Sequence, residues 1–192
     1  MLLFMLLFIL SAANCESPSG AWRRRLENEL FFYSGVDGSI EQGWTDAESR
    51  FTRNQYNVGT DSAEGVARVT MLTNGAEWHL SAREGSEHKT DKGDLVRCRF
   101  QYECTPEELQ HTAAQSKRLD FPIEPCTADM QMVVFDERNE PLAQAEFELA
   151  PNWRIQTLRL PEQPRKVAGF ALRSRAFKEF SFYVGYCFIQ KY

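Results

Sequence analysis

The stretch from residue 66 to residue 100 constrains the fold more than any other part of this chain, because its apolar side chains recur with a period of two. Successive side chains of a β-strand point to opposite faces, so this pattern predicts strands with one buried face. Asn74-Gly75 separates the first two alternating segments, and both residue types tolerate positive φ, so we expect a hairpin there. Residues 92–94 (Lys-Gly-Asp) then break the chain before a third strand that ends at Phe100. This stretch is typical of a β-sandwich.

Short runs of the same character continue along the rest of the chain and are separated by turn residues. We expect further strands at residues 30–34, 44–58, 128–135, 143–149, 153–160, 167–173 and 180–189. About nine or ten short strands of this kind indicate two packed antiparallel sheets. The expected fold is therefore all-β, an antiparallel β-sandwich of jelly-roll type that occupies residues 29–192.

One short helix interrupts this β pattern. Thr105-Pro106-Glu107-Glu108 combines a capping residue, a proline at the first helical position and a glutamate at the third, which is a capping box. We expect a helix from residue 106 to about residue 117, in a crossover loop between strands. The insert from Pro106 to Pro125 either forms an interaction surface or covers an open sheet edge.

The N-terminal residues have the composition of a targeting segment. Residues 1–10 are all apolar and are followed by the small residues Ser11, Ala12 and Ala13. This run is too short to span a membrane, which takes about 20 apolar residues, so we expect a signal peptide over residues 1–15 and a secreted protein. Residues 16–28 then form a lead-in linker. A lipoprotein anchored at Cys15, and a processing site at residues 23–25 (Arg-Arg-Arg), are the alternatives.

Four cysteines follow the expected leader: Cys98, Cys104, Cys126 and Cys187. An oxidising compartment favours disulfides between them. Cys98 and Cys104 are six residues apart on one expected strand, so their Cα atoms would be about 20 Å apart, beyond the ~7 Å limit for a bridge. Cys104 ends its strand and Cys126 begins the next, so we expect Cys104–Cys126 and Cys98–Cys187. Metal ligation is the competing interpretation, but no C-x-x-C pair favours it.

The sequence offers no recognisable catalytic constellation. His79, His88 and His111 fall on a strand, a polar loop and the helix, outside any nucleophile, zinc-protease or phosphate-loop motif. Acidic residues are numerous, yet nothing in their spacing selects a glycosidase pair. A net charge of −5 with dispersed Lys and Arg does not favour nucleic acid or anionic membranes. We therefore expect a protein that is not an enzyme and has no cofactor or metal, and a hydrolase is the remaining alternative.

The order of short motifs resembles a known family. Gly43-Trp44, then Asn74-Gly75, Trp78, Lys92-Gly93 and a strand ending in Phe follow one another as in carbohydrate-binding modules of families 4, 9 and 16, which are galactose-binding-like jelly rolls. The later segments Asn152-Trp153 and Phe182-Tyr183-Val184 are similar to the last strands of those modules. The resemblance covers roughly residues 29–192 and implies a non-catalytic module that binds an extracellular carbohydrate.

This chain departs from the family pattern at two positions. The modules commonly carry Gln three residues after the Trp that corresponds to Trp78, where this chain has Ser81. Their last strand tends to carry an Asp linked to a structural calcium, and Gly185-Tyr186 occupies that place here. The resemblance therefore implies a changed glycan specificity and no bound calcium.

Binding a sugar takes an aromatic side chain for its apolar face and planar polar groups for its hydroxyls. The expected ligand-binding residues are Trp44, Tyr56, Trp78, Trp153, Arg99 and Gln101, on a concave sheet face. Further hydrogen-bonding candidates are Arg50, Gln55, His79 and Gln131. The competing interpretation of each Trp is a core residue of the sandwich. The expected partner is an extracellular glycan or glycoprotein, and the alternative function is a secreted protein-interaction or adhesion domain without a sugar ligand.

Overall fold

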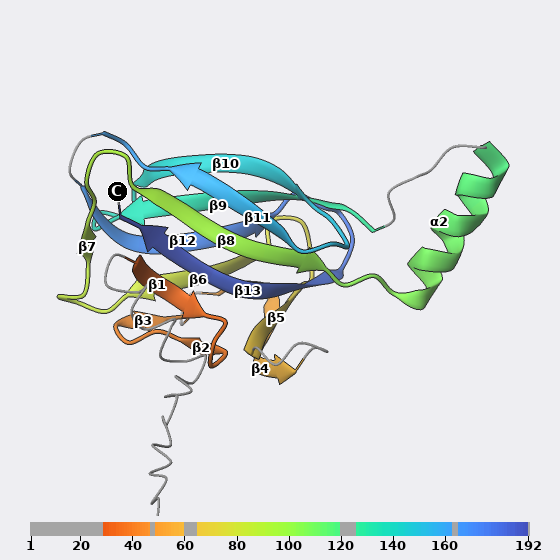
Figure 1. Cartoon of the computed structure of the whole chain (residues 1–192), viewed down its shortest axis with the longest axis horizontal. Coiled ribbons are helices and arrows are strands. Elements are labelled where there is room, and N and C mark those ends of the chain that lie inside the picture. The colour runs from red at the N-terminus through yellow and green to blue at the C-terminus, as the bar shows by residue number, and fades with distance from the viewer. Residues whose placement is uncertain (1–28, 47–48, 60–64, 120–125, 163–164, 192) are drawn as a thin grey trace, which may run out of the picture.

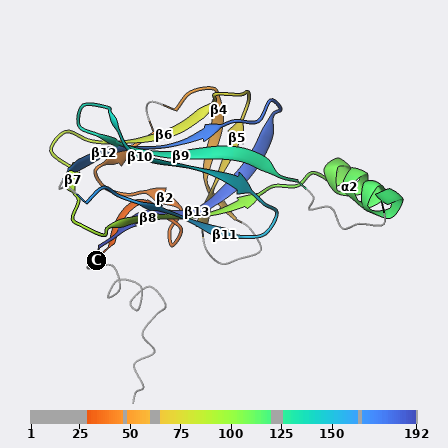
Figure 2. The same cartoon turned by 90° about the horizontal axis from the view of Figure 1, so that it is seen from above.

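Two antiparallel β-sheets face each other in the computed structural model of this chain and enclose a common core (Figures 1 and 2). The structure describes residues 29–46, 49–59, 65–119, 126–162 and 165–191. The expected signal peptide, the lead-in linker and their alternatives at Cys15 and residues 23–25 lie outside these ranges. The all-β sandwich fold that the alternating pattern predicts is confirmed.

Each sheet combines strands from distant parts of the sequence. The seven-stranded sheet contains, in order, β11 (Arg154–Arg159), β8 (Leu95–Tyr102), β13 (Phe180–Gln190), β1 (Glu29–Ser34) and β2 (Ser39–Ile40), while β5 (Gly65–Met71) also pairs with β13 and β4 (Thr52–Gly59) pairs with β5. The six-stranded sheet contains, in order, β10 (Pro141–Leu149), β9 (Ala128–Asp136), β12 (Lys166–Ser174), β6 (Glu77–Ala82) and β3 (Trp44–Thr45), and β7 (His88–Lys89) pairs with β12.

The Asn74-Gly75 turn connects the two sheets and does not close a hairpin. β5 pairs with β4 and β13, whereas β6 pairs with β3 and β12, so the hairpin prediction is wrong. Gly75 does adopt a positive φ of 79°, and its N–H donates to the carbonyl of Ser174 at 2.9 Å. A turn motif selects the local bend of the chain but not the strand partners, which here are chosen by burial of both strands in the shared core.

The core between the sheets is rich in aromatic rings and contains one of two disulfides. Strand β8 alternates regularly, so that Val96, Cys98 and Phe100 point inward. Cys98 lies opposite Cys187 on β13 and is bonded to it, with the two Cα atoms 4.2 Å apart. The structure also joins Cys104 to Cys126, with Cα atoms 5.5 Å apart, so both bridges have the pairing expected from the cysteine spacing.

Helix α2 (Pro106–Leu119) begins with the expected capping box. The backbone N–H of Glu108 donates to Oγ1 of Thr105 at 3.2 Å, and the N–H of Thr105 donates to Oε2 of Glu108 at 3.0 Å. None of the helix residues is buried, and the helix extends away from one end of the sandwich (Figures 1 and 2). It therefore does not cover a sheet edge, which corrects that alternative. No helix of the described residues is long and apolar enough to cross a membrane.

Candidate functional site

The expected ligand-binding residues separate into two groups, and the first of them lies in the core. Trp78 is fully buried and Trp44 is 3% exposed. The Trp44 ring packs edge-on against Phe32, with ring centres 4.3 Å apart, and stacks on His88 at 5.8 Å. Trp78 points inward because it alternates on β6 with the outward-facing Glu77 and His79. Neither tryptophan offers a ring face to a ligand, which corrects the platform prediction for both.

Tyr56 is only partly buried, but it packs against the same core from β4. Its hydroxyl donates to Oδ2 of Asp46 at 2.7 Å and accepts a hydrogen bond from Nε1 of Trp78 at 2.8 Å. Burial raises the pKa of Tyr56 far above its usual range, and the hydrogen bond to Asp46 raises it further. The side chain therefore satisfies the indole N–H of Trp78 and holds β4 to the core, which is a structural role.

Trp153, Arg99 and Gln101 form the second group, on the outer face of the seven-stranded sheet. On β8 the inward positions alternate with Arg97, Arg99 and Gln101, which face outward. Ile155 on β11 pairs with Arg99, so Trp153, two residues earlier, lies beside β8. The Arg99 guanidinium carbon is 4.5 Å from the centre of the Trp153 ring, a cation–π distance. Gln101 donates from Nε2 to the carbonyl of Pro151 at 2.8 Å, which fixes the amide.

The same outer face carries residues that the sequence analysis did not select. Tyr183 on β13 pairs with Gln101 on β8 and with Arg68 on β5, so these three side chains form one row across three strands. Arg68 donates from Nε to Oε2 of Glu103 at 2.8 Å, and the Tyr183 hydroxyl donates to Oε1 of Glu103 at 2.7 Å. Burial alone would raise the pKa of Glu103, but the hydrogen bonds from Arg68 and Tyr183 and the charge of Arg68 outweigh burial and lower it. Glu103 therefore stays ionised and orders its neighbours.

Two hollows meet at Arg68 on the outer face of the seven-stranded sheet and together form a groove. Their volumes are about 480 Å³ and 340 Å³, and both are lined by Arg68, Glu179 and Ser181. We call them together the Arg68 groove. One side is formed by β4, from which Arg53 makes an exposed ion pair with Glu179. The other side is formed by the residues around the start of α2. The remaining lining residues are Asn54, Gln55 and Thr70 in the larger hollow and Tyr102, Glu103, Cys104, Thr105, Pro106, Glu108 and Phe180 in the smaller.

The outer face of the six-stranded sheet is occupied by a cluster of mutual contacts. Nδ1 of His79 lies 3.1 Å from Oε1 of Glu77. The other carboxylate oxygen of Glu77, Oε2, forms an ion pair with Nε of Arg173. The Arg173 guanidinium lies 5.2 Å from the ring centre of Phe135, and Phe135 is only 4% exposed. Ser81, at the position where the resembling modules carry Gln, has its hydroxyl 3.4 Å from Nε2 of His79. The polar groups here pair with one another, so this face offers less to a ligand than the outer face of the seven-stranded sheet.

No family model matches the sequence, and a search of curated proteins finds no match either. Solved structures do match. A variant of a family 29 carbohydrate-binding module superposes with a TM-score of 0.55 at 8% identity, over 85% of this chain and 91% of that one. Variants of the same module in complex with mannohexaose and with cellulohexaose give TM-scores of 0.52 and 0.53, at 8% and 9% identity. They cover 83% and 84% of this chain, and 89% of the module in both cases.

This chain has the fold of those modules. At such identities the likeness concerns the fold alone. It agrees with the sequence resemblance at the level of the carbohydrate-binding modules, although the matching structures described above belong to family 29, whereas the motif order resembled families 4, 9 and 16. The structural neighbours are named carbohydrate-binding modules.

Among the described residues, no group of three or more His, Cys, Asp and Glu side chains is placed to hold a metal ion. Glu107 and His111, four residues apart on α2, line a hollow of about 420 Å³ together with Glu108 and Lys178. The outer face of the seven-stranded sheet carries Trp153, Tyr183 and several fixed planar polar groups. This arrangement suits reversible binding through hydrogen bonds and ring contacts.

Proposed function

We propose that this protein is a secreted, non-catalytic binding module that recognises an extracellular carbohydrate on the outer face of its seven-stranded sheet. The observation that carries the proposal is the placement of Trp153 against Arg99, next to the row formed by Gln101, Tyr183 and Arg68. This arrangement combines an indole ring with planar polar groups on one sheet face. The likeness to modules whose structures contain mannohexaose and cellulohexaose supports it at the level of the fold.

The chemistry of the face matches a polyhydroxyl ligand. A sugar presents an apolar ring face, which an indole covers, and hydroxyls that both donate and accept hydrogen bonds. Arg68 and Glu103 are hydrogen-bonded to each other, so this part of the face offers donors and an acceptor with little net charge. Their mutual contacts also hold them in place before a ligand arrives, which lowers the entropic cost of binding.

The extracellular location is part of the same proposal. Two disulfides are consistent with an oxidising compartment, as is the apolar leader expected at residues 1–15. The expected partner remains a glycan or a glycoprotein.

The test is a glycan array followed by titration calorimetry with mannan and cellulose oligosaccharides. Trp153→Ala should weaken binding by about tenfold to a hundredfold, as for one aromatic contact residue. Phe177→Ala is the matched control, since Phe177 is 91% exposed and lies in the connection between β12 and β13, outside the strands that carry Arg99, Gln101, Tyr183 and Arg68. It should bind as the wild type does. An array without any binding, or equal losses in both variants, would contradict the proposal.

A protein-interaction or adhesion domain is the second candidate, and the exposed aromatics favour it. Phe177 is 91% and Phe51 is 66% exposed, and helix α2 has no buried residue. Exposed rings of this size are enriched where protein partners bind. If the array is silent and Phe177→Ser abolishes binding of the purified protein to cell surfaces, this second function replaces the first.

A further inference from the structure

The two disulfides differ in how accessible they are. Cys98 and Cys187 are both 0% exposed and lie between the sheets. Cys104 is half-buried and lines the smaller hollow of the Arg68 groove, while Cys126 is 8% exposed and lines the separate hollow beside α2. A thiolate attacks a disulfide only when it reaches a sulfur atom, so the bridge between the two hollows should open first.

The backbone at Cys126 adds a second asymmetry. Its φ is +59°, in the left-handed region that residues with a Cβ avoid. Such a conformation persists where the surroundings hold it, and here the bridge to Cys104 joins the end of β8 to the start of β9. Opening the bridge lets the Cys126 backbone relax, while the sandwich keeps its buried Cys98–Cys187 bridge.

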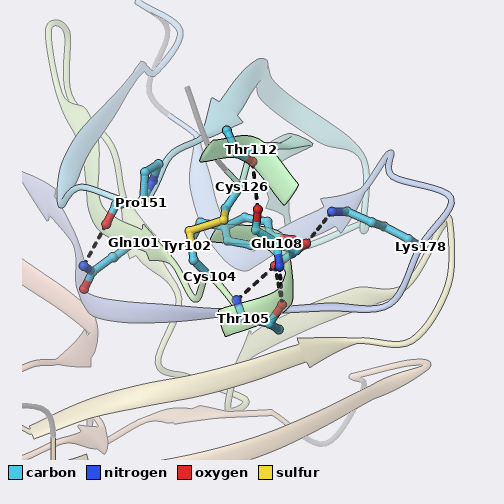
Figure 3. Close-up of a disulfide and its surroundings, with 9 residues drawn as sticks. All are labelled: Gln101, Tyr102, Cys104, Thr105, Glu108, Thr112, Cys126, Pro151 and Lys178. Carbon is cyan, nitrogen blue, oxygen red and sulfur yellow. Dashed lines mark hydrogen bonds and ion pairs between the residues drawn. A yellow bond between two sulfur atoms is a disulfide. The ribbon is translucent and has the colours of Figure 1, made fainter. Parts of the chain in front are cut away.

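Among the described residues, Glu108 makes contacts between helix α2 and the sandwich that do not depend on the bridge. Figure 3 shows Glu108 between Tyr102 and Lys178 and next to Thr105, on the side of the helix that faces the sandwich. The Tyr102 hydroxyl donates to Oε1 of Glu108 at 3.0 Å, and Nζ of Lys178 lies 2.6 Å from the same oxygen. The Lys178 side chain is 53% exposed, so solvent screens that ion pair.

The position of this helix also shapes the Arg68 groove. Cys104, Thr105, Pro106 and Glu108 form one side of the smaller hollow, and Arg68 and Ser181 belong to the part shared with the larger one. Movement of the helix start therefore changes the width of the groove directly, without any change in the sheets.

We propose that Cys104–Cys126 is a redox-sensitive clamp that a dithiol reductant opens selectively, and that its opening loosens the α2 side of the Arg68 groove and weakens ligand binding there. One thiolate of the reductant attacks a sulfur of the bridge and releases the other cysteine as a thiolate, which takes up a proton. The second thiol of the reductant then displaces the remaining cysteine. The reductant leaves as a cyclic disulfide, and two electrons have passed to the protein. The binding part of this inference rests on the proposed function.

The first experiment needs no carbohydrate. The oxidised protein is titrated with dithiothreitol, and the free thiols are alkylated and mapped by mass spectrometry. Cys104 and Cys126 should become alkylated at least about ten times faster than Cys98 and Cys187, because local opening exposes them while the core stays closed. Equal rates, or an earlier reaction of the core pair, would overturn the clamp.

The second experiment examines the groove in the Cys104→Ser/Cys126→Ser double variant, which cannot form the Cys104–Cys126 bridge. Amide exchange in α2 should accelerate several-fold over the oxidised wild type, and the NMR signal of the Arg68 Nε–H should shift. Unchanged exchange and an unchanged Arg68 signal would refute the link between the bridge and the groove. Glu108→Gln with the bridge intact should leave the helix in place, because the clamp remains closed.

The last measurement is the affinity for mannohexaose or cellulohexaose before and after selective reduction. The affinity should fall several-fold on reduction and return on reoxidation. An unchanged affinity would overturn the regulatory role. If neither sugar binds the oxidised protein and the glycan array shows no binding, the proposed function fails. The clamp is then tested by the order in which the cysteines are alkylated and by the NMR signal of Arg68 alone.

Discussion

Replacing Glu77 tests whether the contacts on the six-stranded sheet stabilise the fold. Burial alone would raise the pKa of this carboxyl, but hydrogen bonds from His79 and Arg173 and their charges outweigh it and lower the pKa to about 2, from an ordinary value of 4.5. The difference corresponds to about 3 kcal/mol of unfolding free energy. The Glu77 side chain is only 14% exposed, so little of this energy is lost to solvent screening.

The pH range of the effect follows from the direction of the pKa change. The folded protein keeps Glu77 ionised down to about pH 2, whereas the unfolded chain binds a proton near pH 4.5. The stabilisation is therefore fully present above about pH 4.5 and is lost as the pH falls through this value towards 2. Glu77→Gln should lower the unfolding free energy by about 3 kcal/mol at pH 6, and the gap to the wild type should narrow steadily below pH 4.5.

Urea denaturation of both proteins at pH 6, 4 and 2.5, followed by tryptophan fluorescence, measures this directly. Glu179→Gln is the matched control, since Glu179 is also paired with an arginine, but its side chain is 55% exposed and that of Arg53 is 63% exposed. It should change the stability by less than about 1 kcal/mol. A Glu77 variant no less stable than the Glu179 variant at pH 6, or a gap that does not depend on pH, would refute the reasoning.

Four further substitutions give distinct expected outcomes. Gly35→Ala should destabilise the fold by about 3 kcal/mol or more in thermal melts, because its Cβ would stand 1.7 Å from the carbonyl oxygen of Gly185. Gly75→Ala, whose Cβ would meet no atom within 4 Å, should cost only about 1 kcal/mol for its positive φ. Lys191→Met should cost about 3 kcal/mol in urea titrations, because Asp94 is 0% exposed and loses the ammonium that lies 2.9 Å away; an unchanged midpoint would contradict this. Thr105→Ala should weaken helix α2 by about 1 kcal/mol, seen as faster amide exchange in α2 without a change in the melting of the sandwich.

Local signals in the sequence were sufficient for the elements whose cause is local. The alternation on β8 and the capping box at Thr105 each depend on neighbouring residues, and both are present in the structure. The Asn74-Gly75 motif was also local and did place a turn with a positive φ at Gly75. It failed as a hairpin signal because strand pairing depends on distant strands, which the turn residues do not encode.

The candidate site was harder to predict, because residue type does not reveal which face of a strand carries a side chain. Trp78 and Trp153 have the same chemistry, yet one is enclosed by the core and the other lies beside Arg99 on the outer face. Period-two alternation does assign Arg99 and Gln101 to one face of β8. The row from Gln101 through Tyr183 to Arg68 needs strands β5, β8 and β13 side by side, and that order comes only from the folded topology.

The segment that contains α2 begins and ends at the Cys104–Cys126 disulfide, and this arrangement affects which sequence changes the fold can accept during evolution. β8 and β9 belong to different sheets, and the chain leaves one and enters the other at two cysteines whose Cα atoms are only 5.5 Å apart. Any segment whose ends meet at that distance could be grafted there in place of a helix that contributes no buried residue. Insertions are tolerated best at exposed sites of this kind. Lengthening, shortening or exchange of this segment should therefore be nearly neutral for folding, which leaves it free to acquire new surfaces by mutation.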